Sequence, residues 1–239
     1  MQIDSKVSRA DLVATYIGGP TALFKWDGLR ILTDPTFDPA GTTYSTNLYT
    51  LKKRESPALP VEKLGNIDVV LLSHDHHHDS LDRAGRALLP RAGVVLTTTI
   101  GAERVGGKSA GLPPWGSIDI PTPRGRVLRV TGTPARHGPA GGDRGPVTGF
   151  ILNFADVPDD CIYISGDTVW YEGIEEVARR FKVTMAVLFM GAAVVPEVGR
   201  PEIREVIVYS YRIIYRYTGD DVVILTVHHG ARLLPKDLG

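Results

Sequence analysis

Cysteine is almost absent from this sequence: Cys161 is the single one among 239 residues. One thiol cannot form an internal disulfide, and it cannot build a thiolate cluster of the kind that holds zinc. Because Cys161 opens the apolar run 161–164, we expect it to be a buried core thiol. The composition therefore excludes a disulfide scaffold and a cysteine-based metal cluster.

Long hydrophobic runs and an excess of charge are missing as well. The longest apolar runs, 69–72 and 185–190, are strand-sized, whereas a membrane-spanning helix needs about 20 apolar residues. Residues 1–6 contain no apolar stretch, so we expect no secretory signal and a cytoplasmic protein. Lys and Arg number 27, as do Asp and Glu. Without a global field to attract polyanions, we expect neither nucleic acid nor membrane as a partner.

The chain has the length and the 43 % hydrophobic content of one globular domain, expected to span residues 1–239. An Asp27-Gly28 pair between the apolar runs 21–26 and 29–33 is a strong hairpin signal. Residues 38–59 mix Pro, Thr, Ser and basic side chains and are expected to be irregular. Further strands are predicted over 11–17, 67–72, 94–98, 127–133, 147–154, 161–165, 185–189 and 222–227.

Three helices are predicted, over 81–89 between Ser80 as N-cap and Pro90, over 169–181 and over 201–217. The last is rich in Tyr and β-branched residues, which is unusual for an exposed helix. It is read either as a core-facing helix or as a surface for homo-oligomer formation, because Tyr is enriched at interfaces. The order of elements predicts an α/β (α+β) fold of two packed sheets with helices outside.

All seven histidines fall at three places, and each place follows a predicted strand. Four lie in the run 73–79, one is His137, and two are His228 and His229. A further predicted strand ends in a Gly-Asp-Thr turn that contains Asp167. Histidines placed for packing or solubility would not be confined to strand ends. Since loops at one edge of a layered fold meet, the pattern predicts a single site.

Imidazole and carboxylate groups in this number are typical of a site for divalent metal ions. Zinc binds both at about 2.0–2.2 Å and is expected here, although manganese or iron also suits mixed ligands. In an extended chain His74, His76 and His78 share one face, while His77 points the other way unless a tight turn intervenes. A pair of metal ions about 3.5–4 Å apart can generate a hydroxide nucleophile and polarise the oxygen under attack.

Several motifs resemble those of the metallo-β-lactamase superfamily. The run Ser73–Asp82 resembles its His-x-His-x-Asp-His signature, and Ser165–Thr168 is similar to its bridging-aspartate motif. Its two later histidine motifs have counterparts in Pro134–Pro139 and Val227–Gly230. Thr15–Gly19 and Leu32–Pro35 are similar to the opening hairpin of one branch, which holds L-ascorbate-6-phosphate lactonase-like proteins and, more remotely, N-acylphosphatidylethanolamine phospholipase D. The resemblance covers about residues 12–195.

The resemblance implies an αββα four-layer sandwich with a site for two divalent metal ions at one edge. His74, His76 and His137 would hold the first ion. His78 or Asp79, with His228, would hold the second, Asp167 would bridge the two, and Asp34 would lie beside the ligands. The candidate ligands are His74, His76, His77, His78, Asp79, His137, Asp167 and His228, and the candidate catalytic groups are Asp79, Asp167 and His78.

The signature can be aligned in two registers. Counted from its first histidine, His78 takes the position of the family's aspartate. Counted back from the Leu-Asp pair that follows, Asp79 falls on that aspartate, His77 on the second histidine, and Ser80 replaces the last one. The register decides whether Asp79 can orient the hydroxide or move a proton, which is the usual task of the family's carboxylate.

These patterns predict a metal-dependent hydrolase that uses a metal-bound hydroxide on a carbonyl or phosphoryl centre. The resemblance suggests a small anionic substrate such as a lactone, ester or phosphodiester, with Arg136 or Arg144 as a contact for its anion. The alternatives are a metallo-phosphodiesterase or nuclease on the same fold, and a metal-binding protein with little catalysis. β-Lactam hydrolysis is disfavoured, because no export signal is expected.

Overall fold

The computed structural model describes residues 11–45, 50–138, 142, 144–189, 193–194, 198–200, 202–208, 211–217 and 222–229. The chain divides into two compact units, residues 1–189 and 190–239, and each is described by itself. The single domain expected over 1–239 stays a prediction. Within the described residues, no helix has the length and apolar character needed to cross a membrane.

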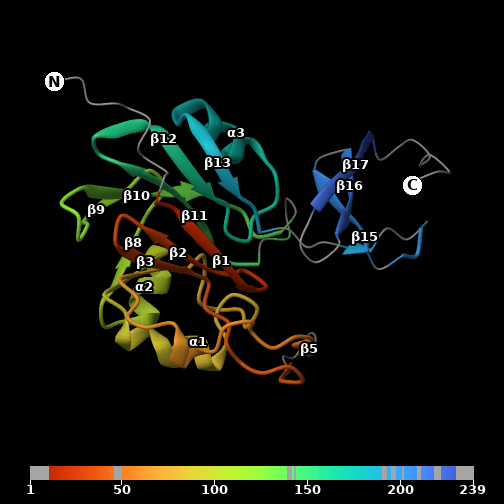
Figure 1. Cartoon of the computed structure of the whole chain (residues 1–239), viewed down its shortest axis with the longest axis horizontal. Coiled ribbons are helices and arrows are strands. Elements are labelled where there is room, and N and C mark those ends of the chain that lie inside the picture. Colours follow the sequence, from red (N-terminus) through yellow and green to blue (C-terminus); the bar gives the residue numbers. More distant parts are fainter. Residues whose placement is uncertain are drawn as a thin grey trace. The chain divides into compact units, whose positions relative to one another are not determined.

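A six-stranded sheet forms the first half of unit 1 (Figure 1). Its strand order is β1-β2-β3-β6-β7-β8. The first three strands pair antiparallel, and β3, β6, β7 and β8 run parallel. The strands are β1 (Val13–Gly18), β2 (Thr21–Trp26), β3 (Leu29–Thr33), β6 (Val69–Leu71), β7 (Val94–Thr97) and β8 (Ser109–Gly111). The hairpin predicted around Asp27-Gly28 is confirmed as β2 and β3.

A five-stranded sheet of order β13-β12-β11-β10-β9 forms the second half of unit 1. Its pairs are antiparallel except for β12 with β13. The strands are β9 (Ser117–Pro121), β10 (Val127–Pro134), β11 (Thr148–Phe154), β12 (Val157–Ile164) and β13 (Val183–Val187). A small hairpin of β4 (Thr43–Ser45) and β5 (Thr50–Lys52) lies in the stretch expected to be irregular.

The helices are α1 (Arg83–Leu88), α2 (Thr99–Val105) and α3 (Glu172–Arg180), with short 3-10 helices η1 (Val61–Lys63) and η2 (Leu89–Arg91). The predicted N-cap of the first helix is wrong. Asp82 caps α1 through a hydrogen bond from the Gly85 N–H to its carboxylate, 2.8 Å long. Pro90 lies inside η2, because proline is tolerated in the first turn of a helix. α2, which the sequence did not predict, is capped by Thr98.

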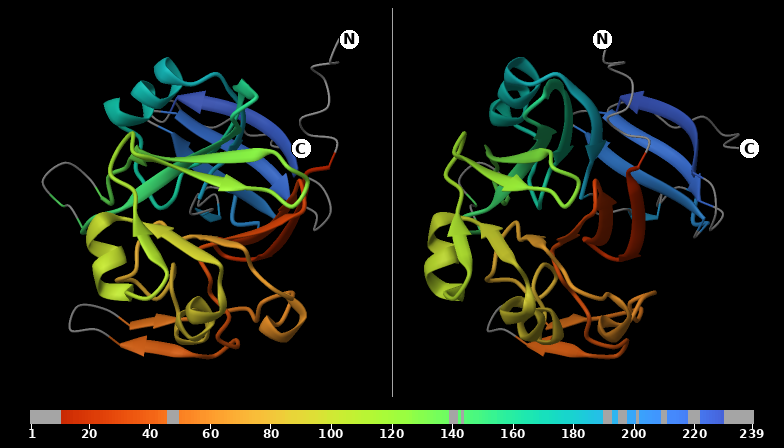
Figure 2. Two further views of the ribbon diagram at one scale, coloured as in Figure 1. Left: turned by 90° about the vertical axis from the view of Figure 1, so that its left-hand side faces the viewer. Right: turned by 60° about the vertical axis from the view of Figure 1, so that its left-hand side comes forward.

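Three groups of buried side chains fix the order of the layers in unit 1. Trp26 of the first sheet meets Phe154 of the second in an edge contact, with ring centroids 4.5 Å apart. Leu88 of α1 packs on the outer face of the first sheet. Ile174 and Val177 of α3 pack on the outer face of the second, beside the buried Cys161. Figures 1 and 2 show α1 and α2 outside one sheet and α3 outside the other, so the predicted αββα sandwich is confirmed.

The ends of several strands meet at one edge of this sandwich. β6 and β7 run parallel, so their C-terminal ends lie side by side, and β6 leads directly into the histidine-rich run. At the start of β11 the N–H of Thr148 donates to the carbonyl of Ser73, at 3.0 Å, which joins the second sheet to the same edge. The carboxyl ends of strands in such sheets are a common place for ligand sites.

Unit 2 is a four-stranded antiparallel sheet of order β14-β15-β16-β17. Its strands are β14 (Ala193–Val194), β15 (Ile203–Val208), β16 (Tyr211–Tyr217) and β17 (Val222–His229). The helix predicted over 201–217 is therefore wrong. Ile and Val lose side-chain freedom in a helix but fit a pleated strand, and strand pairing buries Ile203 and Ile214 completely.

Candidate metal centre

The histidine-rich run leaves β6 and turns sharply. The backbone N–H groups of Ser80 and Leu81 both donate to the carbonyl of His77, at 3.3 and 3.0 Å. An extended run would direct His77 away from His74, but this turn brings the two rings together. Their contact is edge-on, with ring centroids 5.0 Å apart.

Three imidazoles from two loops converge at the edge of the sandwich. His77 Nδ1 lies 3.1 Å from His74 Nε2 and 3.1 Å from His137 Nε2. The candidate ligand atoms of the three residues all lie within 4.8 Å of one another. His74 and His137 are buried, and His77 is half-buried. The three rings thus form a compact nitrogen cluster.

Hydrogen bonds on the far side of two rings fix their orientation. His74 Nδ1 lies 2.9 Å from Ser73 Oγ, whose hydroxyl donates to Asp34 Oδ2 over 2.6 Å. His137 Nδ1 lies 3.2 Å from Asp167 Oδ2 and 3.3 Å from the Asp167 carbonyl. The Asp167 carbonyl can only accept, so His137 Nδ1 carries a proton. With Asp34 ionised, Ser73 donates to Asp34 and accepts from His74 Nδ1, and each Nε2 then directs its lone pair at the cluster.

Burial favours the uncharged form of His74 and His77. Burial, followed by the neighbouring rings of His76, His137 and His77, lowers the pKa of His74 to about 2. Burial and the rings of His76 and His137 also lower the pKa of His77. Neutral imidazole is the form that binds a metal ion, so the cluster is ready for one near neutral pH.

The nitrogen cluster fits a divalent metal ion. In a tetrahedral zinc site with zinc–nitrogen distances of about 2.0–2.1 Å, neighbouring nitrogens lie about 3.3 Å apart. The two separations of 3.1 Å are close to that value. Lone pairs that face one another at this distance repel unless a proton or a cation lies between them. His74, His77 and His137 therefore form a group of nitrogens with the spacing that such an ion requires.

Two carboxylates lie beside the cluster. Burial raises the pKa of Asp167; the charge of Asp79 raises it further, while His137 and Arg144 oppose the shift. Asp79 is exposed, and its charge also acts on His77. The Asp167 side chain is 41 % exposed, so solvent reaches it. Asp167 thus lies behind the His137 ring, on its Nδ1 side, and neither carboxylate belongs to the three-residue group found among the described residues. The bridging role of Asp167 stays a prediction.

The other two histidines of the run are not members of this three-residue group. The His76 ring still packs against it, with its centroid 4.8 Å from that of His74 and 4.3 Å from that of His77. His76 Nε2 lies 2.9 Å from the carbonyl of Arg144, and its Nδ1 is buried without a hydrogen-bond partner. The exposed ring of His78 stacks on Tyr44, with centroids 4.4 Å apart. Instead of the expected trio with His76, the structure groups His77 with His74 and His137. The metal-binding roles assigned to His76 and His78 stay predictions.

The group of His74, His77 and His137 takes one histidine from each of the two possible alignments of the signature. His74 is the first histidine of the forward register, and His77 is the second histidine of the backward one. The run therefore holds one residue more than the pattern between these anchors. Asp79 then occupies the position of the signature's aspartate, and Ser80 that of its last histidine. The Ser80 Oγ lies 3.3 Å from His74 Nε2.

Asp75 anchors the run rather than an imidazole. Its carboxylate accepts two hydrogen bonds from the guanidinium of Arg104 on α2, one of them 2.8 Å long. Its backbone carbonyl accepts a hydrogen bond of 2.7 Å from Arg86 on α1. The sequence did not point to Arg104 or Ser73, because no spacing in the chain signals these contacts.

His228 lies inside β17 and not beyond its end, as the sequence had suggested. Its side chain, like that of His229, lies outside what the structure describes. The role of His228 as a ligand of a second metal ion stays a prediction.

Residues 29–198 match the family described as Beta-lactamase superfamily domain. The chain belongs to the metallo-β-lactamase superfamily. The match runs through unit 1 from β3 to β13 and includes every member of the imidazole cluster. At this level the expectation of an enzyme of the metal-dependent hydrolase class is confirmed.

A curated relative of this superfamily member matches only part of the chain. It is 33 % identical over 75 residues to N-acyl-phosphatidylethanolamine-hydrolyzing phospholipase D 1 from Caenorhabditis elegans, a match that covers 31 % of this chain and 20 % of that enzyme. The chain thus aligns with about a fifth of the length of this curated relative.

Solved structures share the fold. An isothiocyanate hydrolase from Delia radicum gut bacteria has a TM-score of 0.61 at 23 % identity, covering 76 % of this chain and 72 % of that one. A possible metal-dependent hydrolase from Veillonella parvula DSM 2008 has a TM-score of 0.62 at 20 % identity, covering 77 % and 73 %. At this level of identity the likeness concerns the fold alone.

Proposed function

We propose that this superfamily member hydrolyses a carbonyl or phosphoryl substrate, an ester, lactone or phosphodiester, at the cluster of His74, His77 and His137. The observation that carries the proposal is the meeting of three ring nitrogens, two of them 3.1 Å from the third. Two of the three rings have a pKa lowered by burial, so they offer lone pairs and no charge.

A divalent cation held there would supply a nucleophilic water of low pKa and would polarise the oxygen under attack. The chain's own contribution is orientation. Ser73 Oγ accepts a hydrogen bond from His74 Nδ1–H and donates its own hydroxyl to Asp34. Asp167 accepts a hydrogen bond from His137 Nδ1–H. These partners hold the rings in the tautomer that binds metal, which matters as much as the ligands themselves.

Asp79 and Asp167 are the groups proposed to bind a second cation and to handle protons. Their charges act on each other, and Asp79 also acts on His77, so the two carboxylates share one surface of the site. Burial raises the pKa of Asp167, which lets it hold a proton when only one cation is bound. Zinc is the proposed metal for the first position, because three imidazoles form it.

Arg144 is the basic residue that the structure favours for contact with a substrate anion. The backbone carbonyl of Arg144 lies within hydrogen-bond distance of His76 Nε2. The positive charge of its side chain lowers the pKa of both His77 and Asp167, which places it beside the cluster. The guanidinium of Arg136 lies over the ring of Tyr171 instead, 4.5 Å from its centroid. The phosphodiesterase alternative is supported by the phospholipase D relative, and the lactonase-like branch stays a second proposal.

Metal content and turnover together test the proposal. Elemental analysis of the purified parent should give two equivalents of a divalent metal, and His137→Ala and Asp167→Ala should lower that value. The parent should then hydrolyse at least one of a set of p-nitrophenyl esters, a γ-lactone, bis-p-nitrophenyl phosphate, an N-acyl-phosphatidylethanolamine and an aryl isothiocyanate. A protein that binds no metal after reconstitution would refute the proposal. A protein that binds metal but turns over none of these would favour a metal-binding role.

The expected partners are a small-molecule substrate and a second copy of the chain, with neither nucleic acid nor membrane. The Tyr-rich segment over 201–217 is the proposed surface for self-association, now as strands rather than as a helix. Sedimentation velocity over a range of concentrations tests this, and a monomer at every concentration would exclude it.

A further inference from the structure

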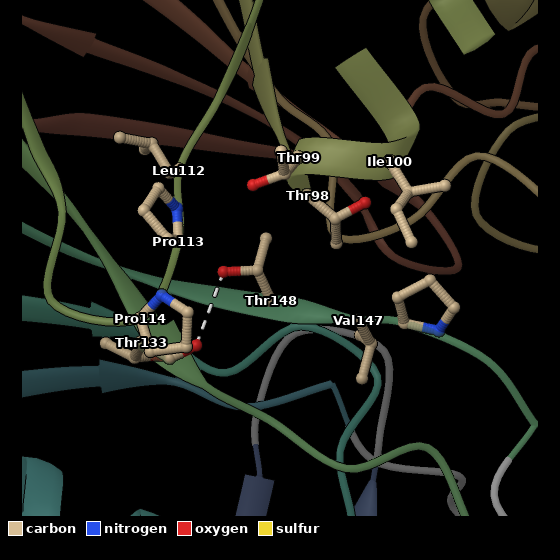
Figure 3. A pocket seen from close by; sticks show the side chains of 10 residues that line it. Thr98, Thr99, Ile100, Leu112, Pro113, Pro114, Thr133, Val147 and Thr148 are labelled. Atoms are coloured by element: carbon tan, nitrogen blue, oxygen red, sulfur yellow. Dashed lines mark hydrogen bonds between the residues drawn. The ribbon is translucent and has the colours of Figure 1, made fainter. Parts of the chain in front are cut away.

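A cavity of about 210 Å³ opens between the two sheets of unit 1 (Figure 3). It lies where β7 and β8 end, opposite the end of β10 and the start of β11. Four separate stretches of chain form its walls. The lining residues are Thr98, Thr99, Ile100, Leu112, Pro113, Pro114, Thr133, Pro146, Val147 and Thr148.

The lining is uncharged and largely apolar. No Asp, Glu, Lys, Arg or His is among its ten residues, and six of them carry only hydrocarbon side chains. Two of the four threonine hydroxyls already have partners. Thr98 Oγ1 accepts from the N–H of Gly101 at 2.9 Å, and Thr148 Oγ1 donates to the carbonyl of Gly149 at 2.9 Å. A charged group placed here would lose its hydration without compensation.

The segment 145–148 links the cavity to the histidine-rich run. Gly145, which precedes the lining segment 146–148, contacts His76 so closely that a Cβ there would lie 2.7 Å from the ring's Nε2. The N–H of Thr148 donates to the carbonyl of Ser73, the residue before His74. On the other side, Thr98 directly follows β7, the strand that pairs with β6. The cavity therefore lies on chain segments that also contact the loop carrying His74 and His77.

We propose that the cavity binds an uncharged apolar group of the substrate, with about six to eight carbon atoms. An apolar protein cavity of about 150 Å³ holds a benzene molecule, so the volume found here accommodates a slightly larger group. The inference rests on the hydrolytic function proposed for the neighbouring metal centre. It narrows the substrate class to esters, lactones or phosphodiesters that carry a medium-length alkyl chain or an aryl ring.

A rim residue offers a variant that fills the cavity. Ile100 lines it from α2 and is 49 % exposed, so Ile100→Trp adds volume at the opening without disturbing the buried core. Glu103 lies on the same helix, is exposed and does not line the cavity, so Glu103→Trp is the matched control. Circular dichroism and the melting temperature establish that each variant folds like the parent.

Chain-length dependence is the first readout. With p-nitrophenyl acetate, butyrate, hexanoate, octanoate and dodecanoate, kcat/KM of the parent should rise about fourfold for each buried methylene until the cavity is full. The rise should stop between hexanoate and octanoate. Ile100→Trp should abolish the preference for hexanoate over acetate and keep the acetate rate, whereas Glu103→Trp should behave as the parent does. Acetate turnover with no dependence on chain length would overturn the cavity proposal and leave the hydrolase proposal standing.

Binding supplies a readout that needs no turnover. Titration with 1-hexanol should shift the methyl NMR signals of Leu112 and Val147 in the parent and in Glu103→Trp. Ile100→Trp should suppress these shifts. Binding without turnover of any substrate in the set named for the hydrolase proposal would refute that proposal and support the cavity as an apolar subsite. Absence of methyl shifts in the parent would refute the cavity proposal.

Discussion

Asp34 combines an uncommon backbone conformation with a buried carboxyl group. It lies in the turn after β3 with a positive φ of 21°, a conformation that is uncommon for a residue other than glycine. Its carboxyl group is fully buried and accepts hydrogen bonds of 2.6 Å from both the N–H and the hydroxyl of Ser73. Burial raises its pKa to about 8, although the hydrogen bonds from Ser73 oppose the shift.

We predict that Asp34 makes the stability of the metal-free protein depend on pH. The folded state holds a proton on Asp34 that the unfolded chain releases above about pH 4. The free energy of unfolding should therefore fall as the pH rises from about 4 to about 8, and this contribution should be constant above that. Urea denaturation of chelator-treated parent and Asp34→Asn across this range measures the difference. Parallel curves for the two proteins would contradict the assignment.

His77 and His78 are neighbours in the sequence with different surroundings. His77 faces two other imidazoles, whereas the exposed ring of His78 stacks on Tyr44. We predict that His77→Ala loses the metal ion of the imidazole cluster and that His78→Ala retains it. Elemental analysis after dialysis against trace metal compares the two variants. Loss of this ion from His78→Ala, with retention in His77→Ala, would restore the forward register of the signature.

At the scale of elements, α1 is fitted closely to the turn that holds Asp34. Gly85 in this helix is buried, and a Cβ at its position would collide with the backbone carbonyl of Pro35. Asp82 at the start of the same helix accepts from the Asp38 N–H over 2.6 Å and pairs with Lys53. The helix therefore sets the position of the turn, and the turn sets Asp34 against Ser73.

We predict that Gly85→Ala destabilises the protein by about 1–3 kcal/mol, because overpacking must move either α1 or the turn. Displacement of Asp34 should also weaken metal binding by about 10–100-fold, the usual effect of losing a partner behind a ligand. Ala87→Ser changes an exposed residue of the same helix and should alter stability by less than about 0.5 kcal/mol. Thermal denaturation and competition with a zinc-binding dye measure both effects. An unchanged metal affinity in Gly85→Ala would separate α1 from the centre.

At the scale of the whole molecule, metal binding should be linked to folding. The unfolded chain has no assembled cluster, because His137 lies far along the sequence from His74 and His77. A ligand that binds only the folded state at about 100 times its dissociation constant adds about 2.7 kcal/mol. Zinc should therefore raise the melting temperature of the parent and leave that of His74→Ala nearly unchanged. Calorimetry with and without chelator tests this, and an equal rise in both proteins would place the metal elsewhere.

Much of unit 1 could be read from local patterns. Alternating or continuous apolar runs bounded by turn residues predicted the strands, because the period of two and the Asp27-Gly28 turn are properties of neighbouring residues. Local patterns gave the wrong element over 201–217, where a dense apolar pattern predicted a helix and the structure has β15 and β16. The pairing of β15 with β16 and β17 decides that segment, and pairing is a contact between residues far apart in the chain.

The sequence by itself determined the sandwich, the edge at which the site lies and the residue types that form it, since strand ends and histidine positions are local signals. Only the tertiary structure decided which histidines meet. The turn closed on the His77 carbonyl rotates that ring toward His74 and His137, and no alternation rule contains such a turn. The cavity likewise exists only in the folded chain, because it needs four distant segments to come together around one uncharged space.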